Sequence, residues 1–197
     1  MANKPQIILA SASPRREQLL REMGLRFVVV RPDGVEEELS GAAPDVLAMQ
    51  NAQRKAGAVA GRHPEAMVIG ADTMVILDGR IFGKPCDPAE AGRMLEQLVG
   101  RQHEVITGVC LLHRAAGTEL TFADTTRVWM RSLSPAQVQA YLRKVNPLDK
   151  AGAYAIQEHG AGIVERIDGS YANVMGLPTE RLRAAFERIG WLGSGGS

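Results

Sequence analysis

Cysteine and histidine are scarce in this sequence, and their spacing excludes several kinds of site. The 197 residues include two cysteines, Cys86 and Cys110, which stand far apart and form no CxxC pair. We therefore expect reduced thiols in place of a disulfide or a cysteine-bound metal. The four histidines have no metal-type spacing, and no Ser-His-Asp or Cys-His arrangement suggests itself. These absences place metal-assisted phosphate chemistry ahead of acyl transfer.

An excess of one charge and long apolar runs are also missing. Twenty-three Lys and Arg residues face 22 Asp and Glu residues, which leaves a net charge of +1. Binding to a nucleic acid polymer or to an anionic membrane is therefore not expected. No stretch approaches the roughly 18 apolar residues of a membrane span, and the run from Ile7 to Ala10 is too short for a signal-peptide core. We expect a cytoplasmic protein.

What the chain does contain is the composition of a packed globular protein, with 45% hydrophobic and 23% charged residues. No linker marks an internal boundary, so we expect a single domain over residues 1–192. The Gly- and Ser-rich residues 193–197 are expected to be a flexible tail or a remnant of cloning.

Turn and capping signals divide the chain into alternating strands and helices. Strands are expected at 7–10, 27–30, 67–71, 75–77, 81–82, 105–113, 120–130 and 163–167. Helices are expected at 14–24, 44–60, 88–98, 135–142 and 179–190. This alternation, with a hairpin signal at Asp78-Gly79, predicts an α/β fold with a mixed twisted sheet, flanking helices and two lobes around a central cleft.

The first segment with chemical potential is Ser11 to Arg16, where a strand ends and a helix begins with two arginines. Free N–H groups at a helix N-terminus bind anions, and Ser13, Arg15 and Arg16 could add donors for phosphate oxygens. Cations in a first helical turn oppose the helix dipole, which favours a functional role for them. The alternative is a pair of solvated surface arginines.

The second segment is Asp72-Thr73, which directly follows a hydrophobic run. A carboxylate at a strand end lies at the rim of a sheet, where α/β folds form ligand crevices. Asp72 could bind a divalent cation or take a proton from water. The alternative is an aspartate that caps a turn.

Three weaker segments complete the set. Lys84 lies between a glycine and a proline and could contact phosphate, although an exposed lysine is the commoner case. Glu36 to Glu38 could supply metal ligands or form a solvated acidic face. The small residues from Lys150 to Gln157 would allow close approach of a ligand, and the Gln157 amide could read a base edge. Together the segments describe one substrate, a polyphosphate surrounded by Arg15, Arg16, Lys55 and Lys84, with Asp72 and Glu37 holding Mg²⁺ or Mn²⁺.

Five motifs along the chain resemble, in the same order, those of the Maf family of nucleoside triphosphate pyrophosphatases. These proteins were once described as septum formation inhibitors. The matching stretches are Ser11–Arg16, Gly70–Thr73, Gly83–Pro85, Asp149–Gln157 and Gly169–Pro178. The resemblance covers about residues 7–190. It implies a two-lobed α/β fold similar to that of inosine triphosphate pyrophosphatases, and cleavage between the α and β phosphates.

The resemblance also implies roles for single residues. Asp72 matches the family's proton acceptor, and Arg15, Thr73 and Gln157 match the positions that set substrate choice. Ser13 lies in the phosphate-binding motif, and Arg16, Lys55, Lys84 and Glu37 match pocket positions for phosphate and metal.

The substrate-choice positions indicate the branch that acts on dTTP and UTP. The alternatives are a 7-methyl-GTP type of enzyme and a nucleotide-binding regulator of septum formation, and a homodimer is left open. One departure is Glu158, which follows Gln157 where a glycine is more usual and could alter selectivity.

Overall fold

The computed structural model describes residues 5–191, so the expected tail at 193–197 lies outside the described part of the chain. Its strands are β1 (Ile7–Ala10), β2 (Phe27–Val29), β3 (Met67–Leu77), β4 (Arg80–Phe82), β5 (Gln102–His113), β6 (Thr118–Met130) and β7 (Val164–Asp168). Its helices are α1 (Pro14–Glu22), α2 (Pro44–Ala60), α3 (Pro88–Leu98), α4 (Pro135–Leu142), α5 (Tyr171–Met175) and α6 (Thr179–Arg188). Two short 3₁₀ turns span Ala151–Ala153 and Gly160–Gly162. Most of these elements lie close to their predicted bounds, whereas α5 and the 3₁₀ turns were not predicted.

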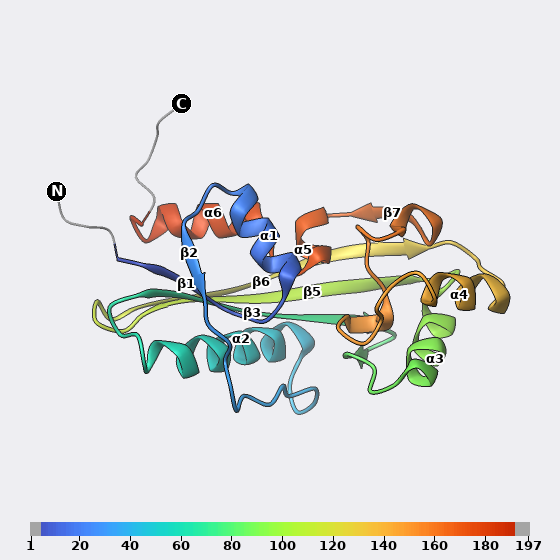
Figure 1. The fold of residues 1–197 in the computed structure, drawn as a ribbon, viewed down its shortest axis with the longest axis horizontal. Helices are drawn as coiled ribbons and strands as arrows, with labels where there is room; N and C mark the ends of the chain where they lie inside the picture. Colours follow the sequence, from blue (N-terminus) through green and yellow to red (C-terminus); the bar gives the residue numbers. More distant parts are fainter. Residues whose placement is uncertain (1–4, 192–197) are drawn as a thin grey trace. The chain divides into compact units, whose positions relative to one another are not determined.

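The strands form one mixed sheet in the order β2-β1-β3-β5-β6-β7, and β4 pairs with β3. Strand β1 runs parallel to both β2 and β3, with Ile8 opposite Val28 on one side and Val68 on the other. Strand pairs β3–β4 and β6–β7 are antiparallel. The prediction of an α/β fold with a mixed sheet and flanking helices is therefore confirmed (Figure 1). Within residues 5–191, no helix is long and apolar enough to cross a bilayer.

The chain divides into two compact units. Of the described residues, 5–72, 107–124 and 176–191 belong to unit 1, and 73–106 and 125–175 belong to unit 2. Strands β3, β5 and β6 each contribute residues to both units. The central cleft between two lobes stays a prediction.

In unit 1, small residues bring α2 unusually close to the sheet. Ala48 and Ala52 of α2 are fully buried. A Cβ atom added to Gly70 of β3 would lie 2.2 Å from the Ala52 carbonyl oxygen, and one added to Gly108 of β5 would lie 2.2 Å from the Ala48 carbonyl carbon. Figure 1 shows α2 on one side of these strands and α1 and α6 on the other. Glycine at the two strand positions thus sets how near the helix backbone lies to the sheet.

Replacing Gly70 with alanine should therefore destabilise unit 1. The added methyl group overlaps helix backbone that cannot move aside alone, and overpacking of this kind costs about 1–3 kcal/mol of unfolding free energy. The control is Gly57→Ala in the interior of α2, where the nearest atom to a new Cβ is the end of the Arg114 side chain at 3.9 Å. That change should stabilise the protein by about 0.5–1 kcal/mol. Equal midpoints for both variants in denaturant titrations would contradict this packing.

In unit 2, the apolar core contains a buried histidine. His103 is 2% exposed, and its Nε2 lies 2.7 Å from the Tyr154 hydroxyl. Its Nδ1 has no hydrogen-bond partner among the described residues. Burial lowers the pKa of His103 from 6.5 to about 4 and raises that of Tyr154. The imidazole is thus neutral in the folded protein at neutral pH.

This burial predicts a pH-dependent loss of stability. Between pH 6.5 and about 4 the unfolded chain protonates His103 while the folded chain does not, so the unfolding free energy falls as the pH falls. The loss is complete below about pH 4 and amounts to about 3 kcal/mol. Chemical denaturation at several pH values should show this slope in the wild type and a smaller one in His103→Gln. An unchanged slope in the variant would show that His103 is not the group responsible.

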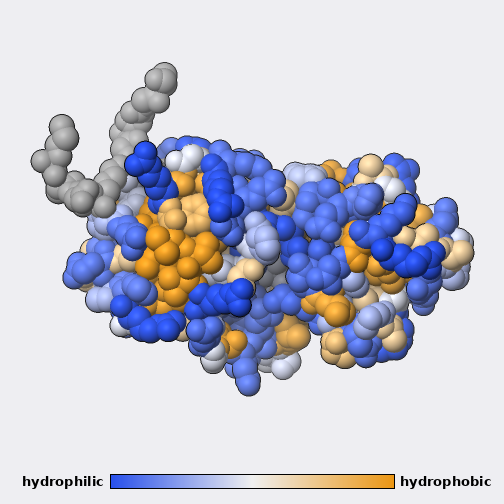
Figure 2. Space-filling model, viewed as in Figure 1, coloured by the Kyte–Doolittle hydropathy of each residue, from blue (hydrophilic) through white to orange (hydrophobic). Residues whose placement is uncertain are grey.

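The edge strand β2 leaves apolar surface uncovered in unit 1. Val28 and Val29 are 44% and 38% exposed, and Figure 2 shows apolar surface where β2 lies in Figure 1. The strand is only three residues long, which limits how far another chain could pair with it. The homodimer stays a prediction.

Candidate active site

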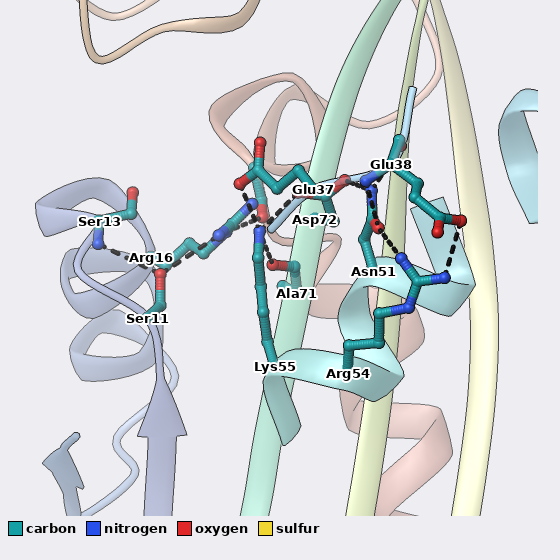
Figure 3. Close-up of polar contacts among 11 residues, drawn as sticks. Ser11, Ser13, Arg16, Glu37, Glu38, Asn51, Arg54, Lys55, Ala71 and Asp72 are labelled. Atoms are coloured by element: carbon teal, nitrogen blue, oxygen red, sulfur yellow. Dashed lines mark hydrogen bonds and ion pairs between the residues drawn. The ribbon is translucent and has the colours of Figure 1, made fainter. Parts of the chain in front are cut away.

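The start of α1 carries a buried arginine. Ser13 occupies the N-cap position with extended backbone, but its side chain makes no capping hydrogen bond. The Ser13 N–H donates instead to Ser11 Oγ at 3.2 Å. Arg16 donates from Nη1 to the same Ser11 oxygen at 3.2 Å and from Nε to the Gly176 carbonyl at 2.8 Å (Figure 3). Arg16 is therefore not a solvated surface side chain, and it joins the first of the five motifs to the last.

The Arg16 guanidinium provides a fixed positive charge. Burial lowers the pKa of Arg16, and the carboxylates of Asp72 and Glu37 act in the opposite direction. An arginine remains protonated in proteins even when its pKa falls. Arg15, the preceding residue, is half-buried and adds a second positive charge near the start of α1.

Asp72 lies within β3, not at its end, so the prediction that the strand stops there is wrong. Strand β3 continues through Asp72 to Leu77, and Asp72 is 3% exposed. A buried carboxylate is tolerated inside a strand only when other groups supply its hydrogen bonds. Those groups come from α2, where Asn51 and Lys55 point toward Asp72 (Figure 3).

The Lys55 ammonium group forms ion pairs with two carboxylates. Its Nζ lies 2.6 Å from Asp72 Oδ1 and 2.7 Å from Glu37 Oε1. Lys55 is 7% exposed, whereas 30% of the Glu37 side chain is exposed. A third acceptor, the Ala71 carbonyl, lies 3.5 Å from Nζ. Two residues proposed for metal binding and one proposed for phosphate binding are thus in direct contact.

Asn51 is a site residue that the sequence did not indicate. It is fully buried, and its Nδ2 donates to Asp72 Oδ2 at 3.0 Å and to the Glu38 carbonyl at 2.9 Å. Its Oδ1 accepts the Glu38 N–H at 3.0 Å. Asn51 and Lys55 are four residues apart on one face of α2, so a polar pair at this spacing on an otherwise apolar face was the available signal. Arg54 adds an ion pair to Glu38 at 2.7 Å.

Removing the Asn51 amide should destabilise the protein while the Lys55 side chain is left unchanged. Asn51→Ala leaves the Glu38 backbone groups and one Asp72 oxygen without this partner, which costs about 1–3 kcal/mol of unfolding free energy. Gln53→Ala on the same helix is the control, since the hydrogen bond that Gln53 donates to Glu119 is exposed to solvent. It should change stability by no more than about 0.5 kcal/mol. If denaturant titrations gave equal losses of unfolding free energy for both variants, Asn51 would not stabilise the segment that contains Glu38.

The remaining predicted residues belong to unit 2. Thr73 directly follows Asp72 in β3, and Lys84 is exposed between β4 and α3. The Gly152 N–H donates to the Gly83 carbonyl at 3.1 Å, so the loop of Lys84 is joined to the segment that leads to Gln157. The structure thus connects the third motif to the fourth.

The nitrogen and the oxygen of the Gln157 amide differ in their contacts. Its Nε2 donates to Glu158 Oε1 at 3.4 Å, while its Oε1 is buried and has no hydrogen-bond partner among residues 5–191. A buried acceptor of this kind costs free energy unless a ligand satisfies it.

The donor set of unit 1 suits a hard divalent cation only in part. Among the described residues, no group of three or more His, Cys, Asp or Glu side chains could hold a metal ion. Two carboxylates do converge, because Glu37 and Asp72 both contact the Lys55 ammonium. Mg²⁺ commonly binds through one or two carboxylates, with water and substrate phosphates as its other ligands. The residues present fit that kind of site.

The fold and this site define a class, an α/β protein with carboxylates and buried cations next to a helix N-terminus. The solved structure of the Staphylococcus aureus Ham1 protein has a similar fold, with a TM-score of 0.53 at 16% identity over 93% of this chain and 98% of that one. Residues 6–189 match the family described as Maf-like protein, and the chain belongs to this family, as its motifs predicted.

Curated relatives match over nearly their whole length. A dTTP/UTP pyrophosphatase of Symbiobacterium thermophilum is 45% identical over 94% of this chain and 95% of its own. A dTTP/UTP pyrophosphatase of Gloeobacter violaceus is 48% identical over 87% of this chain and 90% of its own.

Proposed function

We propose that this chain is a nucleoside triphosphate pyrophosphatase that hydrolyses dTTP and UTP to the nucleoside monophosphate and pyrophosphate. Its membership of the Maf family and its relatives named dTTP/UTP pyrophosphatase support this activity. The observation that carries the proposal is the convergence of Asp72 and Glu37 on the Lys55 ammonium, in the same unit as the buried Arg16. Carboxylates and buried cations in one cluster suit the hydrolysis of a polyphosphate.

The cations would bind the triphosphate. Lys55 and Arg16 are buried, where a low dielectric strengthens hydrogen bonds, and their charge-assisted hydrogen bonds to phosphate oxygens are stronger than neutral ones. The first N–H groups of α1, beside Ser13 and Arg15, offer further donors because a helix N-terminus attracts anions. Lys84 would add a further point charge for the phosphates.

Asp72 would take the proton of the attacking water. In the substrate-free protein both of its oxygens accept hydrogen bonds, from Lys55 and Asn51. Asp72 can act on water once the triphosphate draws Lys55 away from Oδ1. The water oxygen then bonds to the α-phosphorus, its proton passes to Asp72, and the bond from the α-phosphorus to the bridging oxygen breaks, so that pyrophosphate leaves.

Glu37 and Asp72 would hold Mg²⁺ or Mn²⁺. A divalent cation bound there would neutralise charge on the phosphates. Lys55 and the cation would share the same two carboxylates, so binding of the metal also favours release of Lys55 toward the triphosphate.

The base would be read by Gln157, with Thr73 and Arg15 as the other residues that set substrate choice. Uracil and thymine present an N3–H donor beside an O4 acceptor. Gln157 Oε1, which has no hydrogen-bond partner in the described part of the chain, would supply the acceptor that this donor requires. The cytoplasmic location stays a prediction.

Asp72→Asn should leave the fold intact and lower pyrophosphate release by at least about 100-fold, because an amide cannot accept the water proton. The control is Asp78→Asn in the β3–β4 turn, whose positive φ of 50° asparagine also adopts readily. That variant should keep wild-type turnover. Near wild-type pyrophosphate release from Asp72→Asn would remove Asp72 from this role.

A panel of triphosphates tests the substrate class directly. Purified protein with Mg²⁺ or Mn²⁺ should convert dTTP and UTP to monophosphate and pyrophosphate faster than 7-methyl-GTP. Preference for 7-methyl-GTP, or release of orthophosphate instead of pyrophosphate, would contradict the proposal.

A further inference from the structure

The buried side chain of Lys150 forms an ion pair with Glu158, the residue that follows Gln157. Lys150 is 3% exposed, and its Nζ donates to the Asn146 carbonyl and to Asp149 Oδ1, each at 2.8 Å. The same Nζ lies 3.4 Å from Glu158 Oε1. The contacts to Asn146 and Asp149 are hydrogen bonds, and the contact to Glu158 is an ion pair. The Glu158 carboxylate, whose side chain is 40% exposed, is thus paired with a buried positive charge.

This carboxylate selects one orientation of the neighbouring amide. The same Glu158 Oε1 accepts from Gln157 Nε2 at 3.4 Å. An ionised carboxylate accepts hydrogen bonds and donates none, so the amide oxygen cannot take the place of Nε2 there. Flipping the amide would bring two acceptors together beside Glu158. Gln157 Oε1 therefore stays in its buried position with no partner among the described residues.

The orientation of an amide decides which pyrimidine it can read. Uracil and thymine present a donor at N3 and an acceptor at O4, which pair with an amide oxygen and an amide N–H in that order. Cytosine presents the reverse, an acceptor at N3 and a donor at N4. A freely rotating glutamine could meet either base by flipping, and only a held amide distinguishes them.

We propose that Glu158, held by Lys150, fixes the Gln157 amide in the orientation that favours uracil and thymine over cytosine. The inference rests on the proposed function, because it assigns a specificity device to the same substrate site. Glu158 is a positioning residue that acts through Gln157. The second N–H of Gln157 Nε2 remains to donate to O4, while Oε1 accepts from N3–H.

The test is Glu158→Gln, which replaces the carboxylate with an amide that can either donate or accept. The Gln157 amide can then adopt both orientations. In the flipped orientation the amide pairs with cytosine, so we expect kcat/KM for dCTP relative to dTTP to rise about 10-fold. A change of that size corresponds to one two-point contact between an amide and a base. Glu165→Gln, an exposed glutamate of β7, is the matched control for removing one negative charge and should leave the ratio unchanged.

Glu158→Ala gives a second measurement, because it removes the acceptor altogether and should shift the ratio in the same direction. The ratio between two substrates would not move if Glu158 only stabilised the loop, since both rates would then fall together. An unchanged ratio in both variants, in an enzyme that hydrolyses dTTP, overturns this inference alone. A wild-type protein that releases no pyrophosphate from dTTP or UTP overturns the proposed function and this inference with it.

Discussion

The ammonium of Lys55 is the charge on which the acidic cluster of unit 1 depends. It lies within 2.7 Å of oxygens from both Asp72 and Glu37, and both Lys55 and Asp72 are almost completely buried. A buried carboxylate without a partner is strongly unfavourable, and removing one member of a buried ion pair leaves the other uncompensated. The proposed function uses the same pairing, since phosphate oxygens and a divalent cation would take over the contacts that Lys55 and the carboxylates make with each other.

The position of Lys55 is itself a consequence of backbone packing. Helix α2 approaches the sheet through alanines that lie against Gly70 and Gly108. Because the helix backbone is so near, its side chains at positions 51 and 55 reach a carboxylate in the interior of β3 instead of solvent. Asn51 then connects that carboxylate to the backbone of Glu38. The glycines of two strands and the polar residues of one helix therefore form one arrangement, in which packing distance decides which polar groups meet.

Local signals predicted most elements because their causes are local. Helices α1, α2, α3 and α4 all begin with a proline, whose fixed φ suits a first helical turn, and the Asp78-Gly79 turn has positive φ at both residues. The prediction failed at Asp72 because a carboxylate usually ends a buried strand. Here its partners come from a helix about 20 residues earlier in the chain. Asn51 was missed for a related reason, since its four-residue spacing from Lys55 on an apolar helix face was the only local signal and its partners, Asp72 and Glu38, lie elsewhere in the chain.

By itself the sequence determined the α/β class, the helix starts, the family motifs and which residue types could meet a nucleotide. Those features depend on backbone preferences and on residue order, and both can be read along the chain. The tertiary structure decided which of these residues touch. It placed Lys55 between two carboxylates, buried Arg16 against Gly176, and left one oxygen of Gln157 without a partner among the described residues. Such contacts join residues far apart in sequence, and only the packing of helices against strands brings them within hydrogen-bonding distance.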